Sequence, residues 1–315
     1  MFIYRIFCQM LEMHTVYFLL FLVKIFCANA HPLMNDHANL AARSPPQIPA
    51  HERRGVSYND VSLVSLFDKP GSQVTWRYNW DSSSLPSTSW FGFVPMLHSV
   101  RDDHTSRWRG NAEALARKNY NEGGKATWFL GFNEPDMCTP GAGGSCIDVP
   151  TAVAGWKKHM QPLSSLNKNI YLGSPAVTNA APSDTTGLGW LAKFLQLCTG
   201  CSVDFINIHG YGAPSAQAFK SHMNAVRKIA KGRPIWITEF KPEGTNEQIK
   251  RFLEEVMPWV DNSADIHRYA YFMATPGEGF LVDGNRGLSE IGKTYTFFQA
   301  HGEAERTMEN DVDLE

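Results

Sequence analysis

Two glutamates that each follow a short apolar run are the residues best suited to chemistry in this sequence. Glu134 ends the run in "FLGFNEPD", with Asn133 beside it, and Glu239 is the acid of "PIWITEF". Two carboxyl groups roughly 5 Å apart, one protonated and one ionised, can cleave a glycosidic bond with retention of configuration. A neighbouring carboxylate also raises the pKa of the acid, which helps it to donate a proton. Either glutamate alone could instead form a surface salt bridge, so the fold must bring the two together.

The segment "VDFINIHGY" adds polar side chains to a similar run. A period of two places Asn207, His209 and Tyr211 on one face, together with Val203 and Phe205, while the isoleucines occupy the other face. A hydrogen-bonded core histidine is the alternative interpretation of His209 taken alone. Because the polar residues lie toward the C-terminal end of the run, we expect them near the same site as the glutamates.

Aromatic residues are frequent in the same regions, and flat rings suit the CH-rich faces of pyranose sugars. Those near the predicted strand ends are Trp76, Tyr78, Trp80, Trp90, Tyr211 and Tyr271. About half of the aromatic side chains should instead face a helix layer. Trp236 lies an odd number of residues before Glu239 and therefore on the opposite face of the strand, so we expect it to face the helix layer.

Eight short apolar or β-branched runs alternate with amphipathic stretches between residues 55 and 300, and they predict the elements that position these side chains. The predicted strands are 55–59, 74–80, 90–98, 127–134, 170–177, 203–211, 234–240 and 267–274. This alternation predicts a (β/α)8 TIM barrel, in which chemistry takes place at the C-terminal strand ends. A doubly wound sheet is the alternative, but no G-x-G-x-x-G follows the first strand.

The N-terminus has the features of a targeting segment. An apolar run broken by Lys24 ends in a small-x-small pattern at Ala30, so residues 1–30 are predicted to be a signal peptide of a secreted protein, with Met13 as a possible alternative start. A membrane anchor is the alternative, but the uninterrupted run is shorter than the ~20 residues that a spanning helix needs. We expect no membrane association after cleavage.

Polar segments flank the predicted barrel of residues 55–300. Residues 31–54 carry prolines and show no period, which predicts a flexible leader, and Arg53-Arg54 could be a processing site. Residues 301–315 form an acidic tail without a hydrophobic C-terminal signal.

The cysteines that remain after signal removal form two pairs that are local in sequence. In an oxidising compartment they predict the disulfides Cys138–Cys146 and Cys198–Cys201. The "CTGC" spacing also permits a zinc half-site or a redox motif, but a second CxxC is missing from the sequence, so we predict no metal. The glycine-rich loop after Glu134 lacks the Lys-Ser/Thr of a phosphate-binding P-loop.

The composition favours a neutral partner. The 315 residues are 43% hydrophobic, with a net charge of −2 and a pI near 6.6. This chain can bury a large core, and it has no general attraction to nucleic acid or to anionic membranes. We expect a monomer with a single domain of catalytic size.

Together the motifs "YNWD", "PML", "LGFNEPD", "GSPAVT", "DFINIHGY" and "IWITEF" carry a family resemblance. The chain from about Gly55 to Ala300 resembles glycoside hydrolase family 128, the fungal and bacterial β-1,3-glucanases. The resemblance implies a retaining mechanism without a cofactor, with Glu134 as acid/base and Glu239 as nucleophile. The substrate-binding residues that we expect are Asn133, His209, Tyr211, Trp80, Tyr78, Asn79 and Tyr271.

Two departures from the family pattern bear on specificity. Many members carry an aromatic residue where this chain has Gly210, and a tryptophan on strand eight where it has Tyr271. We expect internal cleavage of β-1,3-glucan. The alternatives are a wall-associated β-glucan-binding protein with little turnover, and a hydrolase of another β-glycan such as xylan or β-1,6-glucan.

Overall fold

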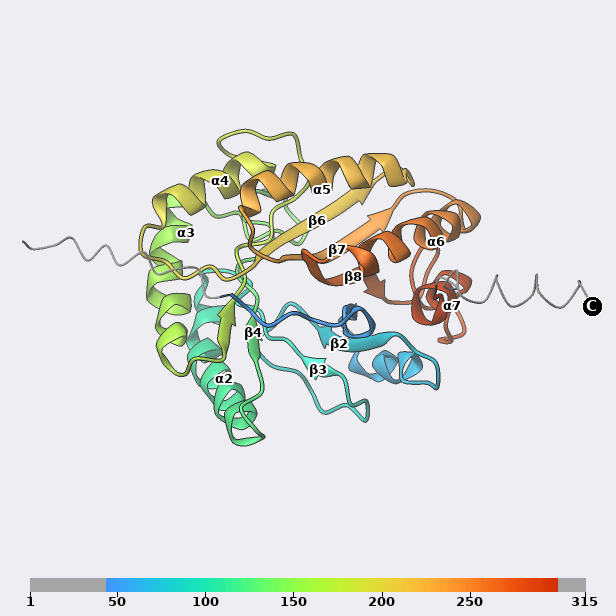
Figure 1. Ribbon diagram of the computed structural model, residues 1–315, viewed down its shortest axis with the longest axis horizontal. Helices are drawn as coiled ribbons and strands as arrows, with labels where there is room; N and C mark the ends of the chain where they lie inside the picture. The colour runs from blue at the N-terminus through green and yellow to red at the C-terminus, as the bar shows by residue number, and fades with distance from the viewer. Residues whose placement is uncertain (1–43, 300–315) are drawn as a thin grey trace, which may run out of the picture. The chain divides into compact units, whose positions relative to one another are not determined.

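Eight parallel strands close into a barrel in the computed structural model, which describes residues 44–299 (Figure 1). Hydrogen-bonded ladders give the orders β3-β2-β1-β8-β7-β6 and β4-β5, and the single bridges Met96–Leu130 and Gly173–Phe205 join these two sheets at both edges. The strands are β1 Arg54–Tyr58, β2 Val74–Tyr78, β3 Gly92–Phe93, β4 Thr127–Phe129, β5 Ile170–Leu172, β6 Ile206–Gly212, β7 Ile235–Pro242 and β8 Ile266–Ala274. The predicted (β/α)8 barrel is confirmed.

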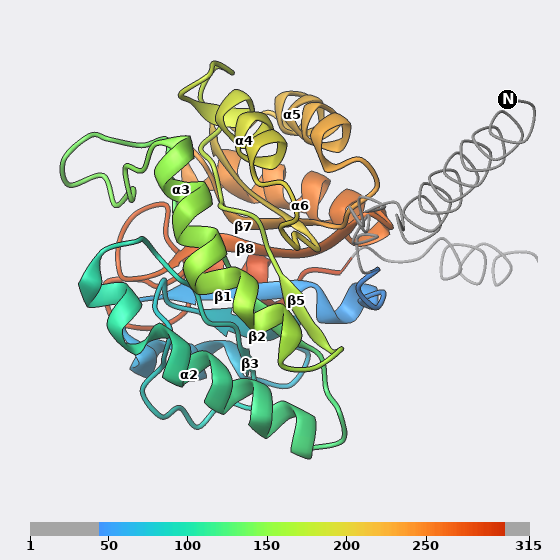
Figure 2. The ribbon, with the colours of Figure 1, turned by 90° about the vertical axis from the view of Figure 1, so that its left-hand side faces the viewer.

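Helices cover the outside of this barrel, as the two views in Figures 1 and 2 show. The α-helices are α2 Asp102–Asn121, α3 Val149–Gly155, α4 Gly187–Leu197, α5 Ala216–Ala230, α6 Asn246–Asn262 and α7 Glu290–Phe297. Short 3-10 helices are η1 Ala50–Glu52, η2 Val61–Phe67 and η4 Gln161–Ser165, and η3 Trp156–Met160 is a π-helix that continues α3. Side-chain caps start several helices, including a capping box between Thr245 and Gln248 at α6. The β2–β3 connection, rich in serine and proline, contains no helix.

An aromatic cluster fills the inside of the barrel. Trp76, Trp128, Phe205 and Trp236 pack there, and the ring centroids of Phe205 and Trp236 are 4.4 Å apart. The prediction that Trp236 faces the helix layer is therefore wrong. The β6–β7 register shifts after Ile208, so one extra residue on β7 separates Trp236 from Glu239 and both point inward.

The end of the predicted leader belongs to the fold. Ile48 packs into the inner cluster, and both guanidinium groups of the Arg53-Arg54 pair are buried. Arg54 begins β1 and pairs with Asp261 at 3.2 Å. The boundary predicted at residue 54 therefore lies inside the domain, and a protease could not reach this dibasic pair in the folded protein. Residues 1–43 and 300–315, with the predicted signal peptide and acidic tail, lie outside the described residues.

Both predicted disulfides, Cys138–Cys146 and Cys198–Cys201, are confirmed. Cys198 is the C-terminal cap of α4, where the helix dipole disfavours the thiolate that a redox cysteine needs. This position favours a structural role for the second pair. Within residues 44–299, no helix combines the length and the apolar character required to cross a membrane.

Candidate active site

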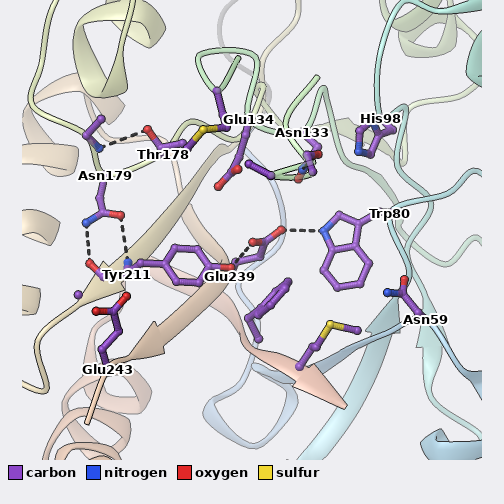
Figure 3. A pocket seen from close by; sticks show the side chains of 17 residues that line it. Asn59, Trp80, His98, Asn133, Glu134, Thr178, Asn179, Tyr211, Glu239 and Glu243 are labelled. Atoms are coloured by element: carbon purple, nitrogen blue, oxygen red, sulfur yellow. Dashed lines mark hydrogen bonds between the residues drawn. The ribbon is translucent and has the colours of Figure 1, made fainter. Parts of the chain in front are cut away.

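A cavity of about 770 Å³ opens at the C-terminal ends of the strands (Figure 3). Glu134, Tyr211, Glu239 and Phe272 reach it from β4, β6, β7 and β8 or the residues that follow them, and Trp80 reaches it from the loop after β2. Side chains far apart in sequence thus converge because the barrel gathers all eight strand ends at one face.

The two predicted glutamates lie close together in this cavity. Single oxygens of Glu134 and Glu239 lie within 4.8 Å of each other and of a nitrogen of His209. Glu134 adopts a left-handed backbone conformation, with φ of 38°, and its N–H donates to the carbonyl of Ala176 at 2.8 Å. Such a conformation is uncommon for a non-glycine residue, and here it aims the carboxyl group into the cavity.

Two hydrogen-bond donors hold the Glu239 carboxyl group. Trp80 Nε1 donates to Oε1 at 2.7 Å, and the Tyr211 hydroxyl donates to Oε2. Burial raises the pKa of Glu239, and the Glu134 carboxylate adds to this effect, whereas His209 and the two donors lower it without cancelling the rise. Both donors stabilise the ionised form of this buried carboxyl group.

His209 lies between the two glutamates and is fully buried. Its Nδ1 is 2.7 Å from Oε1 of Glu134 and 3.4 Å from Oε2 of Glu239. Burial alone would lower the pKa of this imidazole, but Glu239 and Glu134 outweigh burial and raise it. The three side chains can therefore share protons within one hydrogen-bonded group.

Asn133 connects the site to the disulfide-closed loop. Its Nδ2 donates to the carbonyl of Gly143 at 3.1 Å, and its Oδ1 is buried without a partner among the described residues. His98 also hydrogen-bonds Gly143, and burial together with His104 lowers the His98 pKa to about 4. Asn133 lines the cavity, so a ligand hydroxyl could donate to its free oxygen.

Among residues 44–299, the ligand atoms that lie close enough together to hold a metal ion are those of Glu134, His209 and Glu239. Both Glu239 oxygens already accept hydrogen bonds, and His209 already contacts Glu134. A metal ion would have to displace these contacts. The arrangement is typical of carboxyl groups positioned for proton transfer and nucleophilic attack.

The structure separates the predicted site residues into two groups. The cavity is lined by Asn133, Glu134, Glu239, Tyr211 and Trp80. His209 is buried behind this lining and contacts both glutamates. The other three predicted residues do not line the cavity. Tyr78 belongs to the aromatic cluster inside the barrel, and its hydroxyl donates to the Thr238 carbonyl. Asn79 donates to the Ser83 carbonyl within a turn, and Tyr271 packs against Phe240 and Tyr295.

Other cavity residues were missed in the sequence. Phe272, rather than Tyr271, is the aromatic side chain of β8 in the cavity, and Asn59, Asn179 and Glu243 line it as well. Along β8, alternation places Phe272 on the same face as Ala270 and Arg268. Because Arg268 is charged, the sequence did not indicate that this face points into the barrel. The other three lie in loops, where no periodic signal exists.

Comparison with known proteins agrees with this site. Residues 55–295 match the family model described as glycosyl hydrolase catalytic core. Alkali-sensitive linkage protein 1 of Schizosaccharomyces pombe is 29% identical over 260 residues, which cover 77% of this chain and 44% of that relative. The chain thus corresponds to less than half the length of this curated relative.

Two solved structures extend the comparison. A family 128 curdlan-specific exo-β-1,3-glucanase from Blastomyces gilchristii is 34% identical, with a TM-score of 0.67 over 79% of this chain and 100% of that one. A family 128 endo-β-1,3-glucanase from Sorangium cellulosum is 25% identical, with a TM-score of 0.60 over 79% of this chain and 100% of that one. The chain therefore belongs to glycoside hydrolase family 128, within the glycosyl hydrolase catalytic core family.

Proposed function

We propose that this protein is a secreted hydrolase that cleaves β-1,3-glucan with retention of configuration. The observation that carries the proposal is the approach of Glu134 and Glu239, whose oxygens come within 4.8 Å in a large open cavity. Retaining enzymes place their two carboxyl groups about 5 Å apart, whereas inverting enzymes leave more space for a water molecule.

The hydrogen bonds support different roles for the two glutamates. Trp80 and Tyr211 stabilise Glu239 as a carboxylate, so Glu239 attacks the anomeric carbon. The glycosidic C–O bond breaks as Glu134 gives its proton to the leaving oxygen. Glu134 then takes a proton from water, whose oxygen displaces Glu239 and restores both groups. His209, in contact with both carboxyl groups, keeps the proton within the site.

The cavity suits a neutral sugar chain. Trp80, Phe272 and Met273 offer apolar surface for the pyranose rings, and the unpaired Oδ1 of Asn133 can accept a sugar hydroxyl. The similar proteins from Blastomyces gilchristii and Sorangium cellulosum are β-1,3-glucanases, which supports β-1,3-glucan over other β-glycans as the substrate. Two disulfides, typical of oxidising compartments, support secretion.

The test is to incubate the purified protein with β-1,3-glucan, β-1,6-glucan and xylan, and to follow the products over time. We expect hydrolysis of the first substrate, and a loss of at least about a thousandfold in Glu239→Gln and Glu134→Gln. Glu254→Gln, at an exposed glutamate on α6, is the matched control and should retain full activity. An active Glu239→Gln variant would contradict the assigned nucleophile.

The products also distinguish the modes of action. Mixed oligosaccharides would indicate the internal cleavage that we expect, and glucose alone would indicate cleavage from a chain end. If none of the three substrates yielded products while the protein still bound insoluble β-1,3-glucan, the protein would be a glucan-binding protein and the proposed hydrolysis would be refuted.

A further inference from the structure

The end of β6 carries Tyr211, one of the two donors to Glu239, and its two neighbours in the strand add no side-chain packing of their own. Gly210 and Gly212 flank Tyr211 and contribute no side chains. A cavity of about 100 Å³, lined by both glycines, Ala213 and His222, lies beside it. The phenol ring packs edge-on against Phe272, with ring centroids 5.8 Å apart, whereas the backbone of Tyr211, flanked by two glycines, depends on hydrogen bonds for its position.

Strand pairing differs on the two sides of Tyr211. On the β7 side it runs past Tyr211 through Gly212, whose carbonyl accepts the Glu243 N–H at 2.7 Å. On the β5 side, the last bridge joins Val177 to Ile208, and the His209 N–H still donates to the Val177 carbonyl at 3.1 Å. Beyond this bridge, the β5 chain offers no backbone partner to Tyr211.

The side chain of Asn179 takes the place of that missing strand. Its Oδ1 accepts the Tyr211 N–H at 3.0 Å, and its Nδ2 donates to the Tyr211 carbonyl at 2.7 Å, as the dashed lines in Figure 3 show. The amide group thus imitates a peptide unit and satisfies both backbone groups of one residue.

Asn179 is itself anchored to the loop that follows Glu134. Thr178, its neighbour in the chain, donates its N–H to Asp136 Oδ1 at 3.0 Å and its hydroxyl to Asp136 Oδ2 at 2.5 Å. The loop after β4, the turn after β5 and the end of β6 are therefore tied together through successive hydrogen bonds.

We infer that Asn179 is a positioning residue, which holds the Tyr211 hydroxyl on Glu239 by completing the backbone hydrogen bonding of Tyr211. This inference rests on the proposed function, because it assigns a purpose to the Tyr211–Glu239 contact. Asn179 is exposed and lines the cavity, but its amide oxygen and its amide nitrogen both bond the Tyr211 backbone, so we expect its effect on the reaction to pass through the phenol.

The test compares Asn179→Ala, Tyr211→Phe and the double variant by the pH dependence of kcat/KM. Loss of the phenol removes a hydrogen bond that lowers the pKa of Glu239, so the acidic limb of Tyr211→Phe should move upward by about one pH unit. Asn179→Ala should move it in the same direction by about half as much, with a three- to tenfold loss of kcat/KM.

The double variant gives the sharpest result. If Asn179 acts only through the phenol, adding Asn179→Ala to Tyr211→Phe should change neither the limb nor kcat/KM further. A full additional loss in the double variant would overturn the inference, and so would an unchanged pH profile in Asn179→Ala.

A matched control separates positioning from stability. Asn169 likewise donates Nδ2 to a backbone carbonyl, that of Gly124, at 2.6 Å, and it lies outside the cavity. Asn169→Ala should leave the pH profile unchanged, and an equal shift in this control would refute a specific role for Asn179.

A readout without turnover keeps the inference separate from the proposed function. The Glu239 carboxyl group can be titrated by ¹³C NMR in the wild type and in Asn179→Ala. An upward shift in the variant supports the inference even if the wild-type protein hydrolyses none of the tested glycans, whereas identical titrations refute it.

Discussion

Replacement of Arg53 by alanine should destabilise the barrel strongly, although the sequence places this residue in a leader. Its side chain donates four hydrogen bonds to backbone carbonyls: Nε to Ile48 at 3.0 Å, and Nη1 to Val260, Asp261 and Ser263 at 3.3, 2.9 and 2.8 Å. The last three carbonyls belong to the final turn and C-cap of α6. Val260 and Ser263 also accept backbone N–H groups, from Ser263 at 3.0 Å and from Ile266 at 3.1 Å, so the carbonyls of Ile48 and Asp261 depend most on Arg53.

The magnitude follows from these contacts. A buried acceptor that loses its partner costs about 1–3 kcal/mol, and loss of a cation at a helix C-terminus adds about 0.3–1 kcal/mol. Arg53 is 7% exposed, so in the alanine variant water can replace only some of the hydrogen bonds to the partly buried carbonyls of Asp261 and Ser263. We expect Arg53→Ala to lower the free energy of unfolding by about 3–5 kcal/mol, out of the roughly 5–15 kcal/mol typical of a domain.

Urea unfolding followed by tryptophan fluorescence measures this change. Arg101→Ala is the control, because the Arg101 side chain is 72% exposed and should contribute less than about 0.5 kcal/mol. A loss below about 1 kcal/mol in Arg53→Ala would refute the capping role. A chain that begins at Gly55 lacks Ile48, Arg53 and Arg54, and wild-type stability of that chain would show that the domain starts at residue 55 after all.

Three further predictions concern the site. Trp80→Phe removes the 2.7 Å donor to Glu239, so kcat/KM on β-1,3-glucan should fall about 10- to 100-fold, and a change below twofold would contradict this role. The two carboxylates raise the folded-state pKa of His209, so the stability that its cation gives the fold is complete below pH 6.5 and is lost as the pH rises through the folded-state pKa. His209→Gln should therefore lower the free energy of unfolding more at pH 5 than at pH 8. The reverse order would exclude a cationic His209. Joint replacement of Cys138 and Cys146 by serine opens the loop that their disulfide closes, with a sequence separation of 8, and should lower the free energy of unfolding by about 2.5 kcal/mol. It should also raise KM, because residues of this loop line the cavity. An unchanged KM in steady-state assays would show that the loop does not contact the substrate.

The sequence predicted the barrel and its two central acids for a simple reason. Repeated alternation of apolar runs with amphipathic stretches determines the fold class, and an acid directly after such a run must lie at a strand end. Glu134, Glu239 and the polar face of β6 followed from this rule. The disulfides were also predictable, because each joins cysteines that are close in the chain.

Which face of a strand points inward was decided only by the tertiary structure. The period of two tells which residues share a face, but not which face lies inside. On β8 the inner face carries Arg268, whose guanidinium group lies 4.8 Å from the ring centroid of Trp236 and also faces Trp76 and Trp128, while Tyr271 packs outward. Rings from other strands accept the cation, so the interior tolerates a residue that β8 alone would place outside.

Long-range hydrogen bonds determined the remaining features. Arg53 caps helix carbonyls that lie 207 to 210 residues further along the chain, and the Asn179 amide completes the backbone hydrogen bonding of a residue 32 positions away. Neither contact leaves a local or periodic signal, because each partner is defined only after the barrel has closed. The local pattern thus determines the strands and their polar ends, and closure of the barrel determines which side chains meet there.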